Sequence, residues 1–221
     1  MDNLKVTCNL ATPISGNSFM LDSILMYRVA MNLGLEKLDR NTKLNEVKLP
    51  EIPIEKFTFG NEYFYRVSNP IFKIRNVERK SYTKRFPTEK TNLLKEKYHK
   101  NIMTASGLYK SHMKPMDLFS VDKIVWFAKG IKSDIEDIVK DIDSIGGKRN
   151  IGNGVVTSWN VETIEDDYSI SATHNNQRIL MRVIPFELKD QFCDTGYSIS
   201  YGSHRPPYWH PDNYNEIAIP I

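Results

Sequence analysis

The sequence predicts an α+β fold made of two similar halves. Alternating apolar residues at Leu4–Leu10 are followed by helically spaced ones over Met20–Asn32 and by alternating stretches at Glu62–Val67 and Ile71–Val77. A second strand, helix and strand begin at Asp122–Lys129. The order strand, helix, strands and then strand, helix, strand is the split βαβ pattern of a ferredoxin-like (RRM-like) fold.

The first half contains two segments that favour irregular structure. Ala11–Ser18 includes a proline and a glycine and is expected to be a loop after the first strand. The helix over Met20–Asn32 is expected to end before Gly34. Leu35–Pro53 is polar and ends in two prolines, which favours an irregular connection, and residues 68–70 are expected to join the two strands that follow.

The second half contains the clearest helical pattern of the chain. We expect a helix over Ile131–Ile145 that ends at Gly146 and Gly147, followed by a strand at Val155–Val161 and a short one at Ile179–Ile184. The tail from Asp194 onward is rich in Tyr, Pro, Gly and Ser, so we expect it to be irregular but ordered by its aromatic residues. The apolar stripe of the helix consists of Ile131, Ile135, Ile138, Val139, Ile142 and Ile145.

Length and composition favour one soluble domain over residues 1–221, with 40% hydrophobic and 26% charged residues. Cys8 and Cys193 form no C-x-x-C pair, which excludes a zinc ribbon, and we expect both to be reduced thiols in the core. No histidine pair has the spacing of metal ligands, so neither a metal nor a cofactor is expected. No stretch approaches the roughly 18 apolar residues of a membrane span, and the N-terminus does not resemble a signal peptide, so we expect a cytoplasmic protein with no membrane partner.

Positive charge is concentrated in the middle of the chain. Lys73–Lys114 contains twelve Lys and Arg against three acidic residues, a net charge of +9, which leaves −6 for the rest of a chain of net charge +3. Such a segment, with aromatic residues interleaved, indicates contact with a polyanion such as RNA, although a Lys-rich solvated surface is equally compatible with it. We expect an insertion at about 78–118 between the two halves, with a helix around Thr91–Lys100. The candidate RNA-binding residues in it are Lys80, Lys84 and Arg85.

The loop Gly146–Gly154 carries the most specific motif. Four glycines in nine residues allow positive φ angles and a close approach to a ligand, and the basic and amide side chains between them can bind phosphates or base edges. The loop follows a helix, which excludes a Walker loop and a dinucleotide-binding fingerprint. A turn needed only for its geometry is the alternative. The candidate RNA-binding residues are Gly147, Lys148, Arg149, Asn150, Gly152 and Gly154.

A helix followed by G-G-x-R-x-x-G-x-G and a strand resembles the glycine-rich loop of the RAMP superfamily, the RNA-handling subunits of CRISPR surveillance complexes. The segments at 10–13 and 20–25 resemble the start of the subunit that caps the 5′ handle of the crRNA, and those at 159–162 and 205–209 resemble its type IV version. The resemblance implies binding of the crRNA 5′ handle, contact with other subunits of a Class 1 effector complex, and action on invading nucleic acid through that complex. It implies no catalysis in most members.

Some members of the superfamily cleave precursor RNA, which leaves a metal-independent endoribonuclease as an alternative. His99 with Tyr98, or His112 with Tyr109, can supply the acid and base that such a reaction needs. A third alternative is a RAMP-like structural or regulatory protein without affinity for RNA.

The aromatic and proline-rich segment at 194–221 contains three further candidates, Arg205, Tyr208 and Trp209. These side chains can stack on unpaired bases of a handle, or equally form a rigid aromatic plug over the sheet. The same segment contains His204 and His210 on either side of two prolines, which favours a structural role for both histidines.

Overall fold

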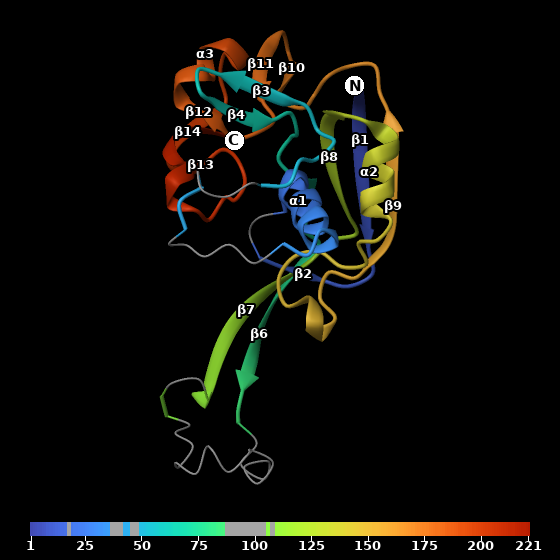
Figure 1. Cartoon of the computed structure of the whole chain (residues 1–221), viewed down its shortest axis with the longest axis vertical. Coiled ribbons are helices and arrows are strands. Elements are labelled where there is room, and N and C mark those ends of the chain that lie inside the picture. Colours follow the sequence, from blue (N-terminus) through green and yellow to red (C-terminus); the bar gives the residue numbers. More distant parts are fainter. Residues whose placement is uncertain (17–18, 36–41, 45–48, 87–104, 107–108) are drawn as a thin grey trace.

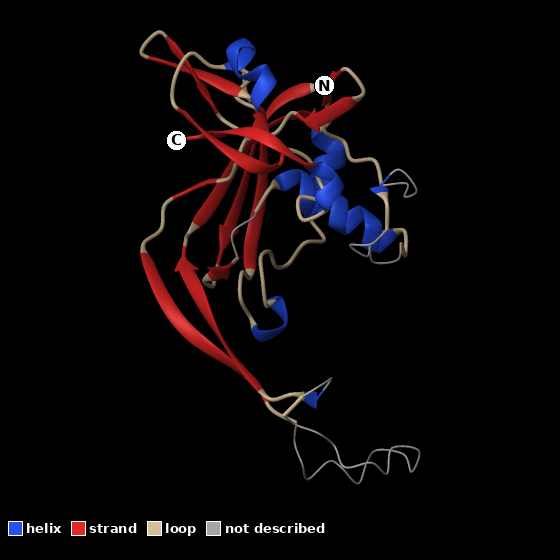
Figure 2. Cartoon of the chain, turned by 90° about the vertical axis from the view of Figure 1, so that its left-hand side faces the viewer, coloured by secondary structure: helices blue, strands red, loops and turns tan. Residues whose placement is uncertain are grey.

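The computed structural model of the chain is mixed α+β, with mostly strands and few helices, as the sequence predicts at this level (Figure 2). It describes residues 1–16, 19–35, 42–44, 49–86, 105–106 and 109–221. The strands are β1 (Asp2–Leu10), β2 (Ile14–Ser15), β3 (Lys56–Phe59), β4 (Glu62–Tyr65), β5 (Ile71–Phe72), β6 (Asn76–Lys84), β7 (His112–Ser120), β8 (Lys123–Gly130), β9 (Val156–Thr163), β10 (Ser171–His174), β11 (Gln177–Leu180), β12 (Ile184–Pro185), β13 (Tyr197–Ser203) and β14 (Tyr214–Pro220). The helices are α1 (Leu21–Asn32), α2 (Lys132–Val139) and α3 (Lys189–Phe192), with short 3-10 helices η5 (Arg149–Ile151), η6 (Phe186–Leu188) and η7 (Pro211–Asn213).

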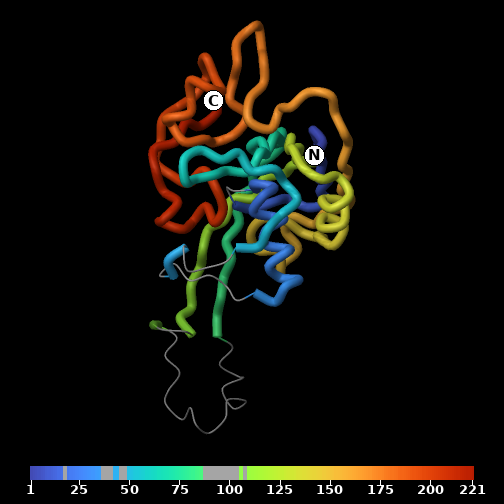
Figure 3. Tube along the Cα trace, turned by 45° about the horizontal axis from the view of Figure 1, so that its top comes forward, coloured from blue at the N-terminus to red at the C-terminus, as the bar shows by residue number. Residues whose placement is uncertain are grey.

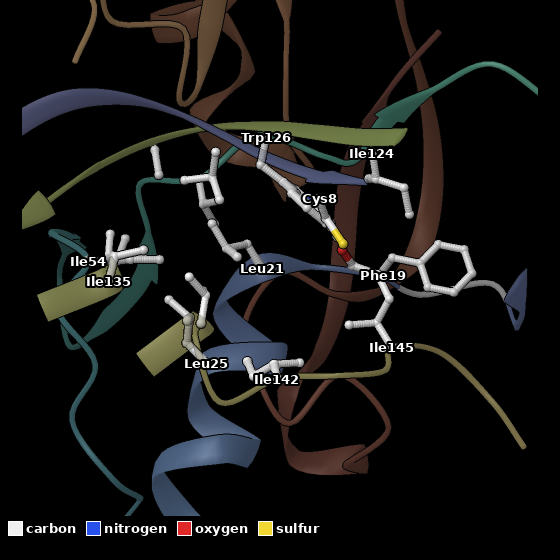
Figure 4. Close-up of a cluster of buried hydrophobic side chains, with 14 of the residues drawn as sticks. Cys8, Phe19, Leu21, Leu25, Ile54, Ile124, Trp126, Ile135, Ile142 and Ile145 are labelled. Carbon is white, nitrogen blue, oxygen red and sulfur yellow. Dashed lines mark hydrogen bonds between the residues drawn. The ribbon is translucent and has the colours of Figure 1, made fainter. Parts of the chain in front are cut away.

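A four-stranded antiparallel sheet of order β5-β8-β1-β9 forms the centre of the molecule. The alternation of β1 directs Leu4, Val6 and Cys8 into the core, where all three are fully buried. Helices α1 and α2 supply the other side of this core (Figure 4). Trp126 from β8 lies within it, and its indole N–H donates to the Phe19 carbonyl at 2.8 Å, so its polar atom is satisfied.

Burial in this core accounts for the confirmed sequence predictions. The strands expected at 4–10, 122–129 and 155–161 and the helix expected at 20–32 are present within two residues of the predicted bounds. Both cysteines are free and buried as expected, and burial raises the pKa of Cys8 to about 12. Each fully buried Leu or Ile side chain contributes about 1.5–3 kcal/mol, which explains why the apolar periodicity determines these elements.

The helix predicted over 131–145 was wrong in its length, because α2 ends at Val139. Ile142 and Ile145 are still buried in the core, so the apolar stripe was correct although the helix does not continue. The backbone beyond α2 bonds instead to the start of β9. The Ile145 N–H donates to the Gly154 carbonyl at 2.9 Å, and the Asp143 carbonyl accepts from Val156 at 2.8 Å. Non-local backbone pairing thus replaces the last turns of the helix.

The strands predicted at 62–67 and 71–77 do not pair with each other. The first is β4, which forms a hairpin with β3 that the sequence reasoning did not anticipate. The second is divided: β5 lies at the edge of the central sheet beside β8, while β6 begins a separate hairpin. The division was missed because apolar residues continue through this segment as far as Ile74 and Val77, although both are exposed.

The basic region contains a long β-hairpin. Strands β6 and β7 pair from Asn76↔Ser120 to Lys84↔His112 and project away from the rest of the molecule (Figures 1, 2 and 3). The strand β2 pairs with the base of β7 through Ile14↔Phe119 and Ser15↔Leu118, within the segment expected to be only a loop. The alternation of β6 was not recognised because nearly all of its residues are polar and exposed. The helix predicted around 91–100 lies outside the described residues.

The prediction of an irregular tail was wrong. Strands β13 and β14 form a hairpin that joins β12 in a three-stranded sheet, and the strand predicted at 179–184 is split between β11 and β12. The many Tyr and Ser residues lie on strands because cross-strand partners decide their conformation, which composition alone does not show. This sheet has its own apolar cluster, which includes Phe64, Ile184 and Ala218.

A buried charged network connects the C-terminal sheet to the rest of the molecule. The side chain of Arg182 is fully buried, and its guanidinium donates to the carbonyls of Tyr65, Val67 and His204. Its Nη2 also lies 3.8 Å from a carboxylate oxygen of Asp22 on α1. A buried guanidinium is tolerated only when its donors are satisfied. These contacts therefore fix the segment of Arg182 relative to three others, which contain Tyr65 and Val67, His204, and Asp22.

The hydroxyl of Tyr208 completes this network. It donates to Asp22 at 2.8 Å and accepts from Arg182 at 3.2 Å. Burial raises the pKa of Tyr208 well above its ordinary value and also raises the pKa of Asp22, although Arg182 opposes the latter rise. The Tyr208 hydroxyl is therefore engaged in hydrogen bonds inside the protein.

We predict that Tyr208→Phe lowers the free energy of unfolding by about 1–3 kcal/mol, because one oxygen of the buried Asp22 carboxyl loses the hydroxyl that donates to it. Tyr201→Phe is the matched control, since Tyr201 is 71% exposed and its removal should change stability by less than about 0.5 kcal/mol. Urea denaturation with an unchanged slope measures both. Equal losses in the two variants would contradict this role of Tyr208.

Candidate nucleic-acid interface

The glycine-rich loop is fixed to the segment that follows β1. The Gly147 N–H donates to the Ser15 carbonyl at 2.8 Å, and the Ser15 hydroxyl donates back to the Gly147 carbonyl at 2.7 Å. At the other end of the loop, the Gly154 N–H donates to Pro13 at 2.9 Å, and the Thr12 hydroxyl donates to Gly152 at 2.8 Å. The loop is thus held from both ends by a segment about 130 residues earlier in the chain.

Two of the glycines are required by this arrangement. Gly154 has φ +63°, and a Cβ on it would lie 1.9 Å from the Ile145 carbonyl oxygen. Gly146 has φ +85°, and a Cβ there would lie 2.8 Å from the Ser15 carbonyl oxygen. Gly146 and Gly154 are therefore needed for the geometry of the turn. The sequence analysis had left this purely geometric role open as the alternative for the whole motif.

The basic residues of the loop face solvent. Lys148, Arg149 and Asn150 are exposed, and the last two lie on η5. Lys148 itself has φ +56°, a left-handed conformation that costs an L-residue roughly 1–2 kcal/mol. Such a conformation at a non-glycine residue motivates the hypothesis that the direction of this side chain matters for function.

Lys148 connects the loop to the projecting hairpin. Its ammonium lies 4.2 Å from the centre of the Tyr82 ring on β6, a cation–π contact. Nearby, the Asn153 amide lies 4.0 Å from the sulfur of Met116 on β7. The structure therefore brings together two segments that the sequence identified separately as RNA-binding candidates.

The two faces of the hairpin differ in charge. Directly paired residues of an antiparallel ladder share a face, so Tyr82 shares its face with Lys114, the residue paired with it. Lys80 and Lys84 lie on that face too, because they are two residues away along β6. Glu78 is also on this face and lies 3.1 Å from Lys80, so Lys84 and Lys114 give the face its excess positive charge. On the opposite face, Arg79 lies 3.6 Å from Asp117 and its charge is balanced. The face that meets the loop is hence the basic one.

Arg149 lies on the other side of the loop, beside a cleft. Its guanidinium carbon is 4.9 Å from the centre of the ring of Tyr27 on α1, a ring that is 47% exposed. The cleft, of about 250 Å³, lies between α1 and the segment before the loop. The sequence reasoning did not identify Tyr27, although an exposed aromatic residue outside the apolar stripe of a helix is the pattern that would have indicated it.

The remaining candidates do not all join this surface. Arg85 follows β6 and is exposed. Arg205 donates to the side chain of Asn213 at 3.0 Å and lies over the ring of Tyr63, and Tyr208 belongs to the interior network described above. Trp209 is 41% exposed and lies in the segment between β13 and η7. For Tyr208 the geometry favours the aromatic plug over base stacking.

Two histidines of the C-terminal segment each lie beside one acidic residue: His204 is 3.3 Å from Glu62, and His210 is 3.7 Å from Asp212. His204 and His210 are buried, and His210 bonds to the Thr42 carbonyl at 2.7 Å. The pKa of His204 is lowered, chiefly by burial. His112 is exposed on β7, and His99 lies outside the described residues. In the part of the chain that the structure describes, no three His, Cys, Asp or Glu residues gather as metal ligands, and no helix is long and apolar enough to cross a membrane.

Comparison with known families decides the relationship. A family model described as CRISPR type IV associated protein Csf3 matches residues 2–220. The chain belongs to this family. No curated protein matches the chain. The family confirms the resemblance to CRISPR-associated proteins of Class 1 and is consistent with the RAMP assignment.

We predict that Gly154→Ala destabilises the chain more strongly than Gly60→Ala. Both residues have positive φ, which costs an alanine about 1–2 kcal/mol, but Gly60 has no atom within 4 Å of an added Cβ. Gly154→Ala must also displace the Ile145 carbonyl, so a further loss of about 1–2 kcal/mol is expected. Urea unfolding of both variants gives the difference, and equal losses would contradict the tight packing of this loop.

Proposed function

We propose that the chain is a non-catalytic RNA-binding subunit that caps the 5′ handle of a CRISPR guide RNA within a multisubunit ribonucleoprotein effector. The observation that carries this proposal is the contact of Lys148 with Tyr82 at 4.2 Å, because it joins the glycine-rich loop to the basic face of the hairpin. Two weak electrostatic sites thereby become one continuous surface that an RNA backbone can follow.

The chemistry of this surface suits single-stranded RNA. Lys84, Lys114 and Lys148 can neutralise phosphates, and Lys80, which lies 3.1 Å from Glu78, is the weaker candidate. The exposed ring of Tyr27 can stack on an unpaired base. Arg149 can hold a phosphate next to that base through its forked guanidinium. None of these groups selects one base over another, which agrees with binding to a backbone held in a fixed shape.

We also propose that the central sheet and its two helices form a ferredoxin-like fold. The sheet order β9-β1-β8-β5, with a helix between β1 and β5 and another between β8 and β9, supports a ferredoxin-like RAMP fold. We infer a single domain over residues 1–221, with a basic insertion at about 78–118 and a C-terminal segment at about 194–221. Its proposed partners are the crRNA, the other subunits of the effector and, through the complex, invading nucleic acid, with action in the cytoplasm and no membrane partner.

We predict that Lys148→Gln and Arg149→Gln weaken binding to single-stranded repeat RNA. Each lost phosphate contact should reduce the slope of log affinity against log salt by about 0.7. Lys132→Gln is the matched control, because the side chain of Lys132 on α2 is 41% exposed and does not belong to this surface. Titration of labelled RNA at several salt concentrations measures the slopes, and unchanged slopes in both loop variants would reject the loop as the RNA contact.

A second candidate function, a metal-independent endoribonuclease, is favoured by one observation. His112 is paired directly with Lys84 across the hairpin, so an acid–base group and a cation lie side by side on the basic face. If the chain cleaves, repeat RNA is cut in EDTA, and His112→Ala abolishes the product. We expect intact RNA on a denaturing gel. Absence of both binding and cleavage would favour the structural or regulatory alternative.

A further inference from the structure

The strand β9 forms the outer edge of the central sheet on the side of α2 (Figure 1). Only the beginning of this edge is paired within the described residues, where the Val156 N–H donates to the Asp143 carbonyl and Ser144 bridges to Val155. Beyond that point, the one strand in the described part of the chain that pairs with β9 is β1, on its inner side. The edge also contains neither lysine nor proline, the residues that usually block further pairing.

The register identifies which backbone groups face this open edge. The Ile164 N–H donates to the Asn3 carbonyl at 2.9 Å, so residues 164, 162, 160 and 158 direct their backbone groups toward β1. Antiparallel ladders alternate, and the residues between them therefore point outward. The outward N–H and C=O groups belong to Trp159, Val161 and Thr163, and they span the length of a short strand.

A groove of about 440 Å³ runs between this edge and α2. Val139 and Val161 form part of its floor together with the ring of Trp159. That ring is fixed, since its N–H donates to the Ile142 carbonyl at 2.9 Å and its face stacks on Trp126 with centroids 6.0 Å apart. A rigid apolar floor beside free backbone groups is the geometry by which other domains add a peptide strand to a sheet.

The charges in the groove indicate what kind of strand fits. Its lining includes Glu136 and Asp143. The ammonium of Lys140 is bonded to Asp137 at 2.6 Å and that of Lys132 lies 3.8 Å from Glu136, so three carboxylates and two ammonium groups leave one negative charge in excess. This excess negative charge repels phosphates, which disfavours RNA here and separates this site from the basic surface of the loop and hairpin. The same carboxylates attract a strand that carries Lys or Arg.

We propose that the groove between α2 and β9 binds an extended basic segment of a partner protein, which pairs with β9 as an additional strand. Alternate side chains of that segment lie over Trp159 and Val161, and its basic residues face Glu136 and Asp143. The inference rests on the proposed function in one respect, because the partner is another protein subunit of the same ribonucleoprotein.

Hydrogen exchange resolved to single amides tests this pairing. The assembly is purified with its guide RNA, and exchange in it is compared with that of the chain alone. We expect the amides of Trp159, Val161 and Thr163 to exchange at least about tenfold more slowly in the assembly, since a ladder bond opens only with local unfolding. The amides of Ser158 and Asn160, already bonded to β1, change little. This alternation distinguishes strand pairing from general coverage of the surface.

Two pairs of variants test the backbone and charge contributions separately. Thr163→Pro removes an outward N–H and should reduce recovery of the chain in the assembly several-fold relative to Thr163→Ala, which keeps that N–H. Glu136→Lys should also reduce recovery, whereas Asp134→Lys, on the same helix but outside the groove, should not. Neither Thr163→Pro nor Glu136→Lys should change the affinity of the isolated chain for RNA.

The outcomes separate this inference from the proposed function. An intact RNA-containing assembly in which the three amides stay unprotected overturns the pairing and leaves the capping role untouched. Protection that develops in the chain alone as its concentration rises assigns the edge to a second copy, and protection by RNA alone assigns it to nucleic acid; either overturns the proposal. A chain that neither binds RNA nor joins an assembly rejects both.

Discussion

The arrangement of this fold depends on one buried guanidinium, that of Arg182. A charge with no exposed surface is tolerated only if every donor is bonded, so the carbonyls of Tyr65, Val67 and His204 and the carboxyl of Asp22 must meet at one point. These groups come from the β3–β4 side, from α1 and from the C-terminal segment. The C-terminal sheet thus has a fixed position against the first helix, although most of its own residues are polar.

The sequence predicted the elements whose apolar period is local and strong. The strand β1 and the helix α1 each bury one regular face, so alternation or helical spacing was sufficient to identify them. Prediction from local periodicity failed where pairing between distant segments decides the conformation. Ile142 and Ile145 continue a helical stripe, but their backbone is taken by the start of β9. The Tyr and Ser residues of β13 have no such period, and only their pairing with β14 makes them a strand.

The candidate site could be predicted in part. Glycines at close spacing identified the loop, because glycine adopts positive φ angles without the steric cost that other residues incur, and charge counting identified the basic segment that contains the hairpin. The sequence could not show that Lys148 reaches Tyr82, since the two residues are brought together by the long-range pairing of β2 with β7. Arg205 and Tyr208 were candidates because of their residue types, yet their polar atoms serve contacts inside the protein, which only the partners reveal.

Ser15 connects the β6–β7 hairpin to the glycine-rich loop. On one side it pairs with Leu118 at the base of the hairpin, and on the other its carbonyl and hydroxyl hold Gly147. The base of the hairpin and the glycine-rich loop are accordingly both attached to Ser15. Because β2 pairs with β7 and also bonds Gly147, we expect a change in the direction of β7 to shift β2 and, through these two hydrogen bonds, the start of the loop. The positions of the loop and of the base of the hairpin are therefore coupled to each other.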